Sequence, residues 1–295
     1  MSRVIVVGAG VVGLSCAVRL LEAGHRVDVV ARDLPLETTS AVAAALWYPY
    51  RALPQDRVTA WAATSYGAFA ALASAEPDAG VRMMAGTSVV APGTTAPWWA
   101  DAAPALTRVA DGWSFEAPVA DMPVYLRWLA GRVEALGGTI SRLNLRYLPE
   151  GGDVVVNCSG IGARLLASDP SVIPVRGQVV VVEQVGLDHW WLESSGPLYV
   201  VPRTDDIVLG GTDEEGDWSR TPSPDTAARI ISRASAVVPS LASARVLRHK
   251  VGLRPARPVV RLEREGRVVH CYGHGGAGIT LSWGCADEVA GLVEG

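Results

Sequence analysis

Two glycine-rich turns, one near each end of the chain, have the residue types that bind an electron-rich ligand through backbone N–H groups. Gly8-Ala9-Gly10-Val11-Val12-Gly13 follows the apolar run Val4-Ile5-Val6-Val7, and Gly273-His274-Gly275-Gly276-Ala277-Gly278 follows Val268-Val269-His270-Cys271-Tyr272. Both patterns predict a buried strand, a turn poor in side chains and a new helix, whose N-terminus adds positive potential. Two such turns so far apart in the sequence suggest one large ligand that both ends of the chain hold.

The first turn has the G-x-G-x-x-G spacing of dinucleotide-binding proteins, and it lies between a predicted strand and a predicted helix, which is the context that supports the motif. Gly8 permits the turn, Gly10 lets the backbone approach a pyrophosphate, and Gly13 lets the helix pack on the strand. The ribose-binding residue is less clear, because Arg32 stands where an acid is expected and Asp33 follows it. Arg32 could pair with the 2′-phosphate of NADP, whereas the second glycine turn favours FAD.

Arg254 is the candidate for binding a carboxylate, because a guanidinium pairs with a carboxylate in a planar, bidentate geometry. It lies in Gly252-Leu253-Arg254-Pro255-Ala256-Arg257-Pro258. Prolines stiffen this segment and remove N–H donors, so we expect neither an ordinary helix nor a central strand here. Surface salt bridges are the alternative for Arg254 and Arg257. Tyr199 could donate its phenolic proton to the same carboxylate, although a tyrosine in such a strand is more often a core residue.

His274, in the second glycine turn, is the obvious candidate for a general base. A flavin that accepts a hydride from a carbon bearing a neutral amine needs no protein base, so we predict no acid or base residue. The sequence contains no Ser-His-Asp order, no paired-carboxylate pattern and no His/Cys spacing typical of metal sites. We therefore predict no metal.

The elements that would position these residues indicate an α/β fold. Strands are predicted at 4–7, 27–31 and 153–156, and short antiparallel strands at 178–183, 198–202 and 207–210. Helices are predicted at 11–23, 56–76, 123–136 and 223–237, with a final helix that runs through Val293, and residues 85–115 are predicted to form short strands and loops. This order indicates a Rossmann-like unit interleaved with an antiparallel-sheet unit.

Composition excludes several classes of protein. Of the 295 residues, 49% are hydrophobic and 19% charged, and the net charge of −4 provides no basic surface for nucleic acid. No apolar run reaches the ~18–20 residues that a membrane span requires. The four cysteines (Cys16, Cys158, Cys271 and Cys285) form no C-x-x-C pair and lie in apolar segments. We expect them to be reduced core residues of a cytoplasmic protein.

Taken together, these stretches resemble the D-amino-acid oxidase family of flavoproteins over most of the chain. The most specific are residues 252–258 and 272–280. The resemblance also rests on residues 8–15, 31–35, 38–40, 45–50, 156–160, 176–178 and 199–202. It implies a Rossmann-like FAD-binding domain made of residues 1–50, 137–176 and 252–295, and an antiparallel α+β substrate-binding domain made of residues 51–136 and 177–251.

The resemblance also implies the reaction and the site. Neutral D-amino acids would undergo oxidative deamination by hydride transfer to the flavin N5, with O₂ as acceptor, giving 2-oxo acids, ammonia and hydrogen peroxide. Arg254 would pair with the substrate α-carboxylate, Tyr199 would donate a hydrogen bond to it, and the carbonyl of Gly276 would accept one from the amine. FAD would be held without a covalent bond by Gly8, Ala9, Gly10, Val11, Val12, Gly13, Ala31, Arg32, Asp33, Thr38, Thr39, Ser40, Ala45, Leu46, Trp47, Leu145, Ser159, Gly160, Arg254, Gly273, Gly275, Gly276, Gly278, Ile279 and Thr280.

Three other functions remain open. A D-aspartate oxidase would need a further cation, for which Arg203 and Arg220 are candidates, but the acidic run Asp213-Glu214-Glu215 argues against a pocket for anions. A glycine- or sarcosine-type amine oxidase and a non-catalytic flavin-binding protein are the others. Residues 193–197 are too short for the lid loop of the mammalian enzymes, so we expect an open pocket. The assembly could be a homodimer.

Overall fold

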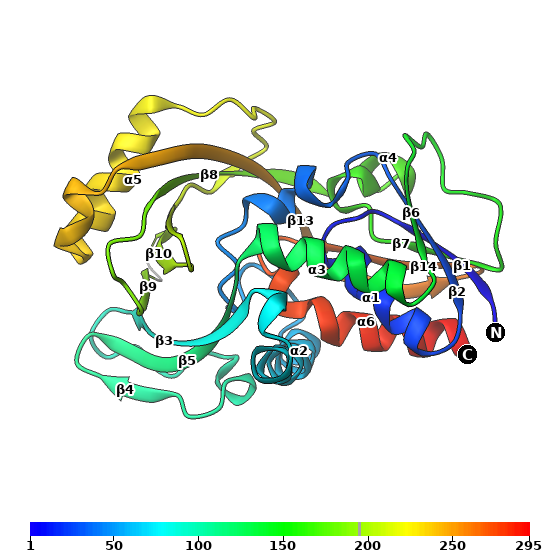
Figure 1. The fold of residues 1–295 in the computed structure, drawn as a ribbon, viewed down its shortest axis with the longest axis horizontal. Coiled ribbons are helices and arrows are strands. Elements are labelled where there is room, and N and C mark those ends of the chain that lie inside the picture. Colours follow the sequence, from blue (N-terminus) through cyan, green and yellow to red (C-terminus); the bar gives the residue numbers. More distant parts are fainter. Residues whose placement is uncertain (194–195) are drawn as a thin grey trace.

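A computed structural model describes residues 1–193 and 196–295 of the chain (Figure 1). The helices are α1 (Val11–Glu22), α2 (Gln55–Ala75), α3 (Met122–Ala135), α4 (Ala163–Leu166), α5 (Pro224–Val237) and α6 (Gly278–Glu294). The strands are β1 (Arg3–Val7), β2 (Arg26–Ala31), β3 (Val81–Val89), β4 (Thr107–Val109), β5 (Gly112–Ala120), β6 (Thr139–Arg142), β7 (Val154–Asn157), β8 (Ile173–Glu183), β9 (Trp190–Glu193), β10 (Leu198–Pro202), β11 (Asp206–Gly210), β12 (Glu214–Glu215), β13 (Val246–Glu265) and β14 (Val268–His274).

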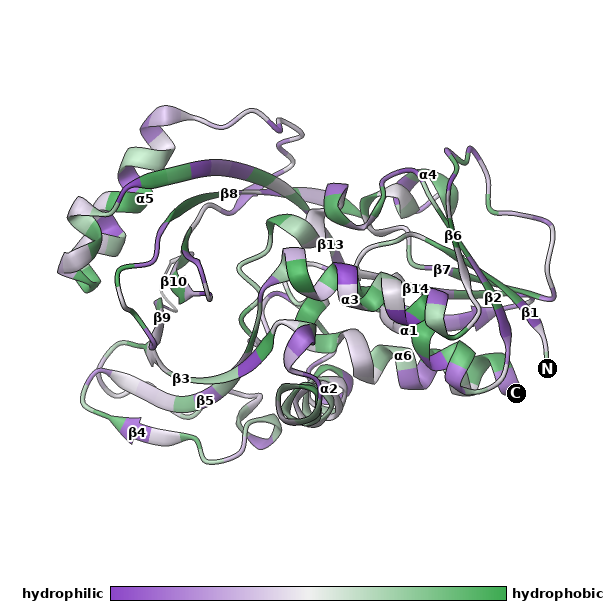
Figure 2. Ribbon diagram, viewed as in Figure 1, coloured by the Kyte–Doolittle hydropathy of each residue, from purple (hydrophilic) through white to green (hydrophobic). Residues whose placement is uncertain are grey.

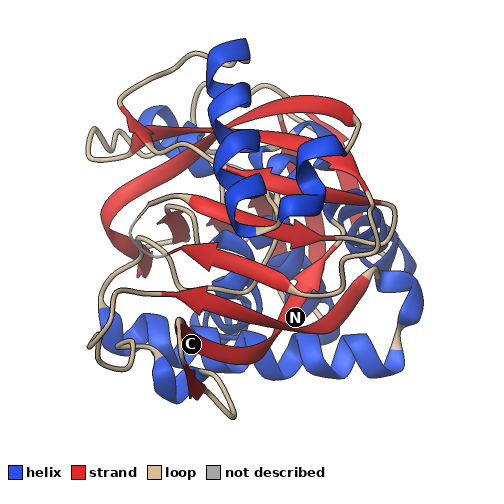
Figure 3. Cartoon of the chain, turned by 90° about the vertical axis from the view of Figure 1, so that its left-hand side faces the viewer, coloured by secondary structure: helices blue, strands red, loops and turns tan. Residues whose placement is uncertain are grey.

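Within the described residues the strands form one sheet, in the order β4-β5-β3-β9-β10-β11-β8-β13-β14-β7-β1-β2-β6, with β12 paired to β8 at the side. The run from β14 through β7, β1 and β2 to β6 is parallel. Most of the remaining pairs are antiparallel, as between β8 and β13. Figure 3 shows the strands in the middle of the molecule and helices along its upper and lower edges. The predicted α/β class is therefore confirmed.

Local sequence explains the Rossmann-like end of this sheet. The apolar residues of β1 and β7 are buried, as expected for strands covered on both faces. Figure 2 shows hydrophobic turns along α1 and α6, and most residues of both helices are buried, including the consecutive residues 13–18 of α1 and 279–286 of α6. Gly24, with φ of 84°, follows the last turn of α1, where glycine adopts the left-handed conformation at little cost.

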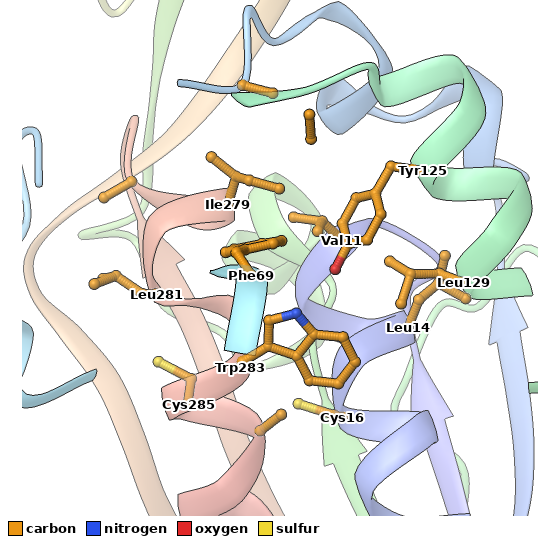
Figure 4. Packing of buried hydrophobic residues seen from close by; sticks show 14 of the residues in the cluster. Val11, Leu14, Cys16, Phe69, Tyr125, Leu129, Ile279, Leu281, Trp283 and Cys285 are labelled. Carbon is orange, nitrogen blue, oxygen red and sulfur yellow. The ribbon is translucent and has the colours of Figure 1, made fainter. Parts of the chain in front are cut away.

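The core beneath this end of the sheet is built from four helices. Figure 4 shows Leu14 of α1, Phe69 of α2, Tyr125 of α3 and Trp283 of α6 packed together, with the hydroxyl of Tyr125 pointing toward the indole. Each of the four side chains is at most 3% exposed. Residues predicted as separate helices therefore share one core, which holds the N-termini of α1 and α6 in place.

The prediction that residues 252–258 cannot form a central strand is wrong. They lie in the middle of β13, which pairs with β8 on one side and β14 on the other. Pro255 stands opposite Pro174 of β8, and an antiparallel pair that exchanges no hydrogen bonds needs no N–H group. The pairing with β14 shifts register between Ala256 and Arg261, which accommodates Pro258 in an irregular part of the ladder.

Residues 85–115 form strands and loops, as predicted, but two of the strands extend beyond this range, because β3 and β5 are nine-residue strands paired along their whole length. In the part of the chain that the structure describes, no helix is both long enough and apolar enough to span a membrane.

Candidate functional site

A cavity of about 980 Å³ runs from the carboxyl ends of β1, β2, β7 and β14 across β8, β10 and β13. A crevice at the carboxyl ends of parallel strands is the usual ligand site of an open α/β sheet. Its wall contains these predicted residues: Gly8, Ala9, Gly10, Val11, Val12, Gly13, Ala31, Arg32, Asp33, Thr38, Thr39, Ser40, Ala45, Leu46, Leu145, Ser159, Gly160, Tyr199, Arg254, Gly275, Gly276, Gly278 and Ile279.

The first glycine turn has the close contacts that its spacing predicts. Gly8 has φ of 115°, and a Cβ there would overlap the carbonyl of Cys158, while a Cβ on Gly13 would overlap the carbonyl of Gly8. Gly10 precedes α1 and has no side chain to cap the helix. The backbone therefore lies directly on the cavity. The N–H of Val11 donates to Oγ of Ser40, so the later N–H groups of the first turn of α1 are the ones that would bind an anion.

Arg32 and Asp33 at the end of β2 form an ion pair with each other. The Nε and Nη2 atoms of Arg32 donate to the two carboxylate oxygens of Asp33, over 3.0 and 2.5 Å. These bonds lower the pKa of Asp33, and the charge of Arg220 lowers it further. Because the guanidinium of Arg32 already holds a carboxylate bidentately, this geometry does not favour a 2′-phosphate in its place.

The second glycine turn adjoins the first. The N–H of Gly275 donates to the carbonyl of Pro255 over 2.9 Å, which ties the turn to β13. Gly278, the first residue of α6, would bring a Cβ within 3.9 Å of the side chains of Val11 and Val12. Two side-chain-poor helix N-termini thus face the same cavity. They fit an elongated dinucleotide with a polar ring system at the far end.

Arg254 extends from β13 over a glycine of the neighbouring strand. A Cβ on Gly177 would lie 2.5 Å from Cζ, Nη1 and Nη2 of Arg254, so the absence of a side chain at residue 177 makes room for the guanidinium. Nη1 donates to the carbonyl of Thr212 over 2.8 Å. The side chain is 17% exposed. The cation is therefore fixed at the cavity wall and still has donors for a carboxylate.

Tyr199 on β10 has the same relationship with β11. Its ring occupies the space that a side chain on Gly210 would need, and Gly210 is its cross-strand partner. The phenol oxygen lies 3.0 Å from the position of a Cβ on Gly211, the residue before the Thr212 that accepts from Arg254. The two predicted carboxylate ligands thus reach consecutive residues of one segment.

Tyr50, Arg51 and Asp213 form a polar group beside Arg254. The hydroxyl of Tyr50 donates to Oδ2 of Asp213 over 2.7 Å, and Nη1 of Arg51 donates to the same oxygen over 2.5 Å. Burial and the bond to this carboxylate raise the pKa of Tyr50 to about 12. The ring of Tyr50 also lies against Gly276, where a Cβ would be 2.5 Å from Cδ1. The phenol therefore stays protonated at neutral pH.

Arg257, three residues after Arg254 on β13, has a structural partner. Its Nε donates to Oδ2 of Asp169 over 2.8 Å, and the hydroxyl of Tyr272 donates to the same oxygen over 3.0 Å. Burial raises the pKa of Asp169, but the bonds from Ser171, Arg257 and Tyr272 outweigh it and leave this pKa well below its ordinary value. Of the two alternatives for Arg257, the structure shows the salt bridge.

Three predicted cofactor residues do not lie on the cavity wall. The indole of Trp47 points into the core, where it packs edge-on against other aromatic rings. Its N–H donates to the carbonyl of Ala62 over 3.0 Å. The side chain of Thr280 exchanges hydrogen bonds with the backbone of Tyr48. Gly273 lies against the side chain of Arg257. These residues support the wall from behind.

Gly177, Gly210, Tyr50 and Asp213 are cavity residues, or direct neighbours of cavity side chains, that the sequence analysis did not select. The register of β8 with β13 and of β10 with β11 shows which side chains the two glycines accommodate. Tyr50 and Gly177 lie in the stretches 45–50 and 176–178 on which the family resemblance rests, so the sequence does mark these two positions. Of the short stretch 193–197, Ser194 and Ser195 lie outside the described residues, so the expected open pocket remains a prediction there.

All four cysteines are free and buried, as predicted, but they also gather in one place. The thiols of Cys16 and Cys158 are 3.9 Å apart, and Cys271 lies within 4.8 Å of both. Cys271 is also 3.9 Å from Nε2 of His274, which is 4% exposed and reaches the cavity wall. Sequence spacing gives no sign of this cluster, because its members come from α1, the segment after β7, β14 and α6.

Comparisons with known proteins give a consistent result. Residues 3–292 match the family described as FAD dependent oxidoreductase. The chain is 50% identical to a D-amino-acid oxidase of Rubrobacter xylanophilus, over 99% of this chain and 96% of that one. It is 39% identical to the D-aspartate oxidase of Homo sapiens, over 99% and 95%. A glycine oxidase structure from Bacillus cereus superposes with a TM-score of 0.82 at 21% identity, covering 100% of this chain and 97% of that one.

Proposed function

Because this chain belongs to the FAD dependent oxidoreductase family, we propose that it oxidises neutral D-amino acids to 2-oxo acids, with release of ammonia and hydrogen peroxide. The observation that carries the proposal is Arg254. Its guanidinium is held at the wall of the cavity that the two glycine turns open onto, in a chain half identical to a D-amino-acid oxidase. A small zwitterion fits that arrangement.

FAD supplies the acceptor for the substrate hydride when it is bound, and its electrons pass to O₂ to give hydrogen peroxide. The chain contributes the backbone of residues 8–13 and the N-terminus of α1 for the pyrophosphate. The N-terminus of α6 would face the ring system, where its N–H groups stabilise negative charge. Gly275, Gly276 and Gly278 present backbone and no side chain to the cavity.

Arg254 would hold the substrate α-carboxylate, Tyr199 would donate a hydrogen bond to it, and the carbonyl of Gly276 would accept one from the α-amine. Three fixed substituents leave one direction for the side chain, which would select the D-enantiomer. The amine must be neutral for its lone pair to assist loss of the hydride, so no side-chain base is required. The imino acid formed would then add water and lose ammonia outside the site.

Oxidation of D-aspartate is less well supported, because one of the two cations proposed for its side chain is paired elsewhere and the other lies near an acid. Arg203 forms a buried pair with Asp206, with bonds of 2.7 and 2.9 Å, and it is not on the cavity wall. Arg220 is on the wall, where its charge lowers the pKa of Asp33. The division into an FAD-binding domain (1–50, 137–176 and 252–295) and a substrate-binding domain (51–136 and 177–251) is part of the proposal. A cytoplasmic location and a homodimer are also parts of the proposal, and light scattering would test the homodimer.

The deciding experiment is anaerobic mixing of the purified, FAD-loaded protein with single amino acids while flavin absorbance is followed. We expect D-alanine, D-valine and D-methionine to bleach the flavin and their L-enantiomers to leave it oxidised. D-aspartate and glycine should bleach it more slowly than D-alanine. Failure of every D-amino acid would overturn the proposal, and faster bleaching by D-aspartate or glycine would replace its substrate class.

A further inference from the structure

A carboxylate lies beside the proposed substrate anchor. Oδ1 of Asp213 is 4.0 Å from Nη1 of Arg254, and Asp213 also reaches the cavity wall. Its other oxygen is occupied by the hydroxyl of Tyr50 and by Arg51. Oδ1 is buried, and in the described part of the chain it has no hydrogen-bond partner. An unpaired buried carboxylate oxygen is costly, so its position needs an explanation.

Asp213 is held in place from the side away from Arg254. Arg51 bridges Asp213 and Glu215, and Glu215 is exposed and does not reach the cavity wall. Tyr50 fixes the second lone pair of the same oxygen while its ring packs on Gly276. The negative charge is therefore fixed next to Arg254 before any ligand arrives.

Among the described residues, the other arginines of the cavity wall form no ion pair with Asp213, whose ion-pair partners are Arg51 and Arg254. Arg32 is paired with Asp33, and Arg164 donates to the carbonyls of Pro170 and Val172 over 2.5 and 3.1 Å. The charge of Arg220 lowers the pKa of Asp33. Among the described wall arginines, Arg254 is the one that forms an ion pair with Asp213, so a ligand carboxylate on Arg254 would lie beside a fixed negative charge.

We propose that Asp213 is a specificity-determining residue that opposes negative charge in the substrate pocket. It weakens the hold of Arg254 on any simple carboxylate, and it disfavours a second carboxylate in the substrate side chain. The pocket therefore accepts D-amino acids with neutral or cationic side chains and rejects acidic ones. The inference rests on the proposed function, because it takes Arg254 as the substrate anchor.

The test compares the FAD-loaded Asp213→Asn protein with the wild type and with Glu215→Gln. Asparagine keeps the size of the side chain and an acceptor for Tyr50, and Glu215→Gln removes a charge from the same network away from the cavity. Butyrate, which has the carboxylate but no amine, is titrated against the flavin spectrum. Kinetics with D-alanine and D-aspartate follow. Asp213→Ser replaces Asp213→Asn if the latter fails to hold FAD.

Asp213→Asn should tighten butyrate binding about three- to tenfold and raise kcat/KM for D-aspartate relative to D-alanine at least about tenfold, since like charges in a partly desolvated site repel. Glu215→Gln should change both by less than about twofold. Unchanged or weaker butyrate binding in folded Asp213→Asn overturns the inference. Butyrate binding needs no turnover, so a wild type that D-alanine fails to reduce would overturn the proposed function separately.

Discussion

The guanidinium of Arg254 occupies the space above Gly177 on the neighbouring strand, where a Cβ would lie 2.5 Å from three of its atoms. The side chain therefore depends on the absence of another side chain. Gly177 pairs with Gly252 across the ladder, two residues from Arg254 on the same strand. The position of the Arg254 guanidinium thus depends on Gly177, a residue that has no side chain of its own.

Gly177→Ala should displace the guanidinium and raise KM for D-alanine at least about tenfold, because misplacement of an anchoring group removes most of a charged hydrogen bond. FAD binding should persist. Steady-state kinetics with a flavin titration checks both. Gly131→Ala is the control: Gly131 lies within α3 with open space at its Cβ, so alanine should stabilise the protein by about 0.5–1 kcal/mol without changing KM.

Arg254→Ala should keep FAD and lose about 2–4 kcal/mol of transition-state binding, at least tenfold in kcat/KM, because a charged pair in a partly desolvated site disappears. Arg257→Ala is the matched change on the same strand. It breaks the bond to Asp169 and should lower stability by about 1–3 kcal/mol while kcat/KM stays within about twofold. Near-parental efficiency of Arg254→Ala with D-alanine would refute the assignment of the carboxylate ligand.

Asp169 should make stability depend on pH in the acid range. Its folded pKa lies below its unfolded value of about 3.9, so its contribution is complete above that value and is lost as the pH falls through the folded pKa. The free-energy difference between wild type and Asp169→Asn should therefore be largest near pH 7 and shrink toward pH 3.5. Urea unfolding at several pH values measures it.

The exposed Thr204 provides the control for that series, since Thr204→Ala removes no ionisable group and should leave the pH dependence of stability unchanged. An equal free-energy difference for Asp169→Asn at pH 3.5 and pH 7 would show that Asp169 contributes by packing instead.

Ser40→Ala should weaken FAD binding about fivefold, because its Oγ accepts from the N–H of Val11 over 3.0 Å and links the loop after β2 to the first turn of α1. Fluorescence titration of the flavin-free protein with FAD gives the dissociation constant. Ser243→Ala, at an exposed position outside the cavity wall, should leave it unchanged. An unaltered constant in Ser40→Ala would mean that the loop holds its place without this bond.

The glycine turns could be predicted from sequence because their function depends on backbone geometry, which glycine spacing records directly. Gly8 and Gly13 lie where the motif requires them. Arg254 could be selected because its residue type is specific for carboxylates, but its place in a central strand was mispredicted. Proline is disfavoured in strands because it cannot donate a ladder hydrogen bond. Here Pro255 and Pro174 stand opposite each other in one ladder, which the sequence alone does not indicate.

Residues whose role depends on packing between distant segments could not be predicted. Trp47 belongs to a motif associated with the cofactor, yet its indole points into the aromatic core toward Tyr66 and Trp99. In the sequence Asp213 stands out only as part of an acidic run, because its closeness to Arg254 arises from the fold. Asp213 and Arg254 are far apart in the sequence, as are Gly177 and Arg254, so the sequence alone does not indicate that these residues are in contact.

The long strand β13 has a consequence for how new specificities can arise. It carries Arg254 in its middle, and the carbonyl of Pro255 bonds to the N–H of Gly275, so anchor and second glycine turn belong to one continuous hydrogen-bonded frame. Evolution or engineering can therefore exchange the wall segments around residues 192–193, 196–198 and 213–220 for others that admit different side chains, while the reacting carbon keeps its place.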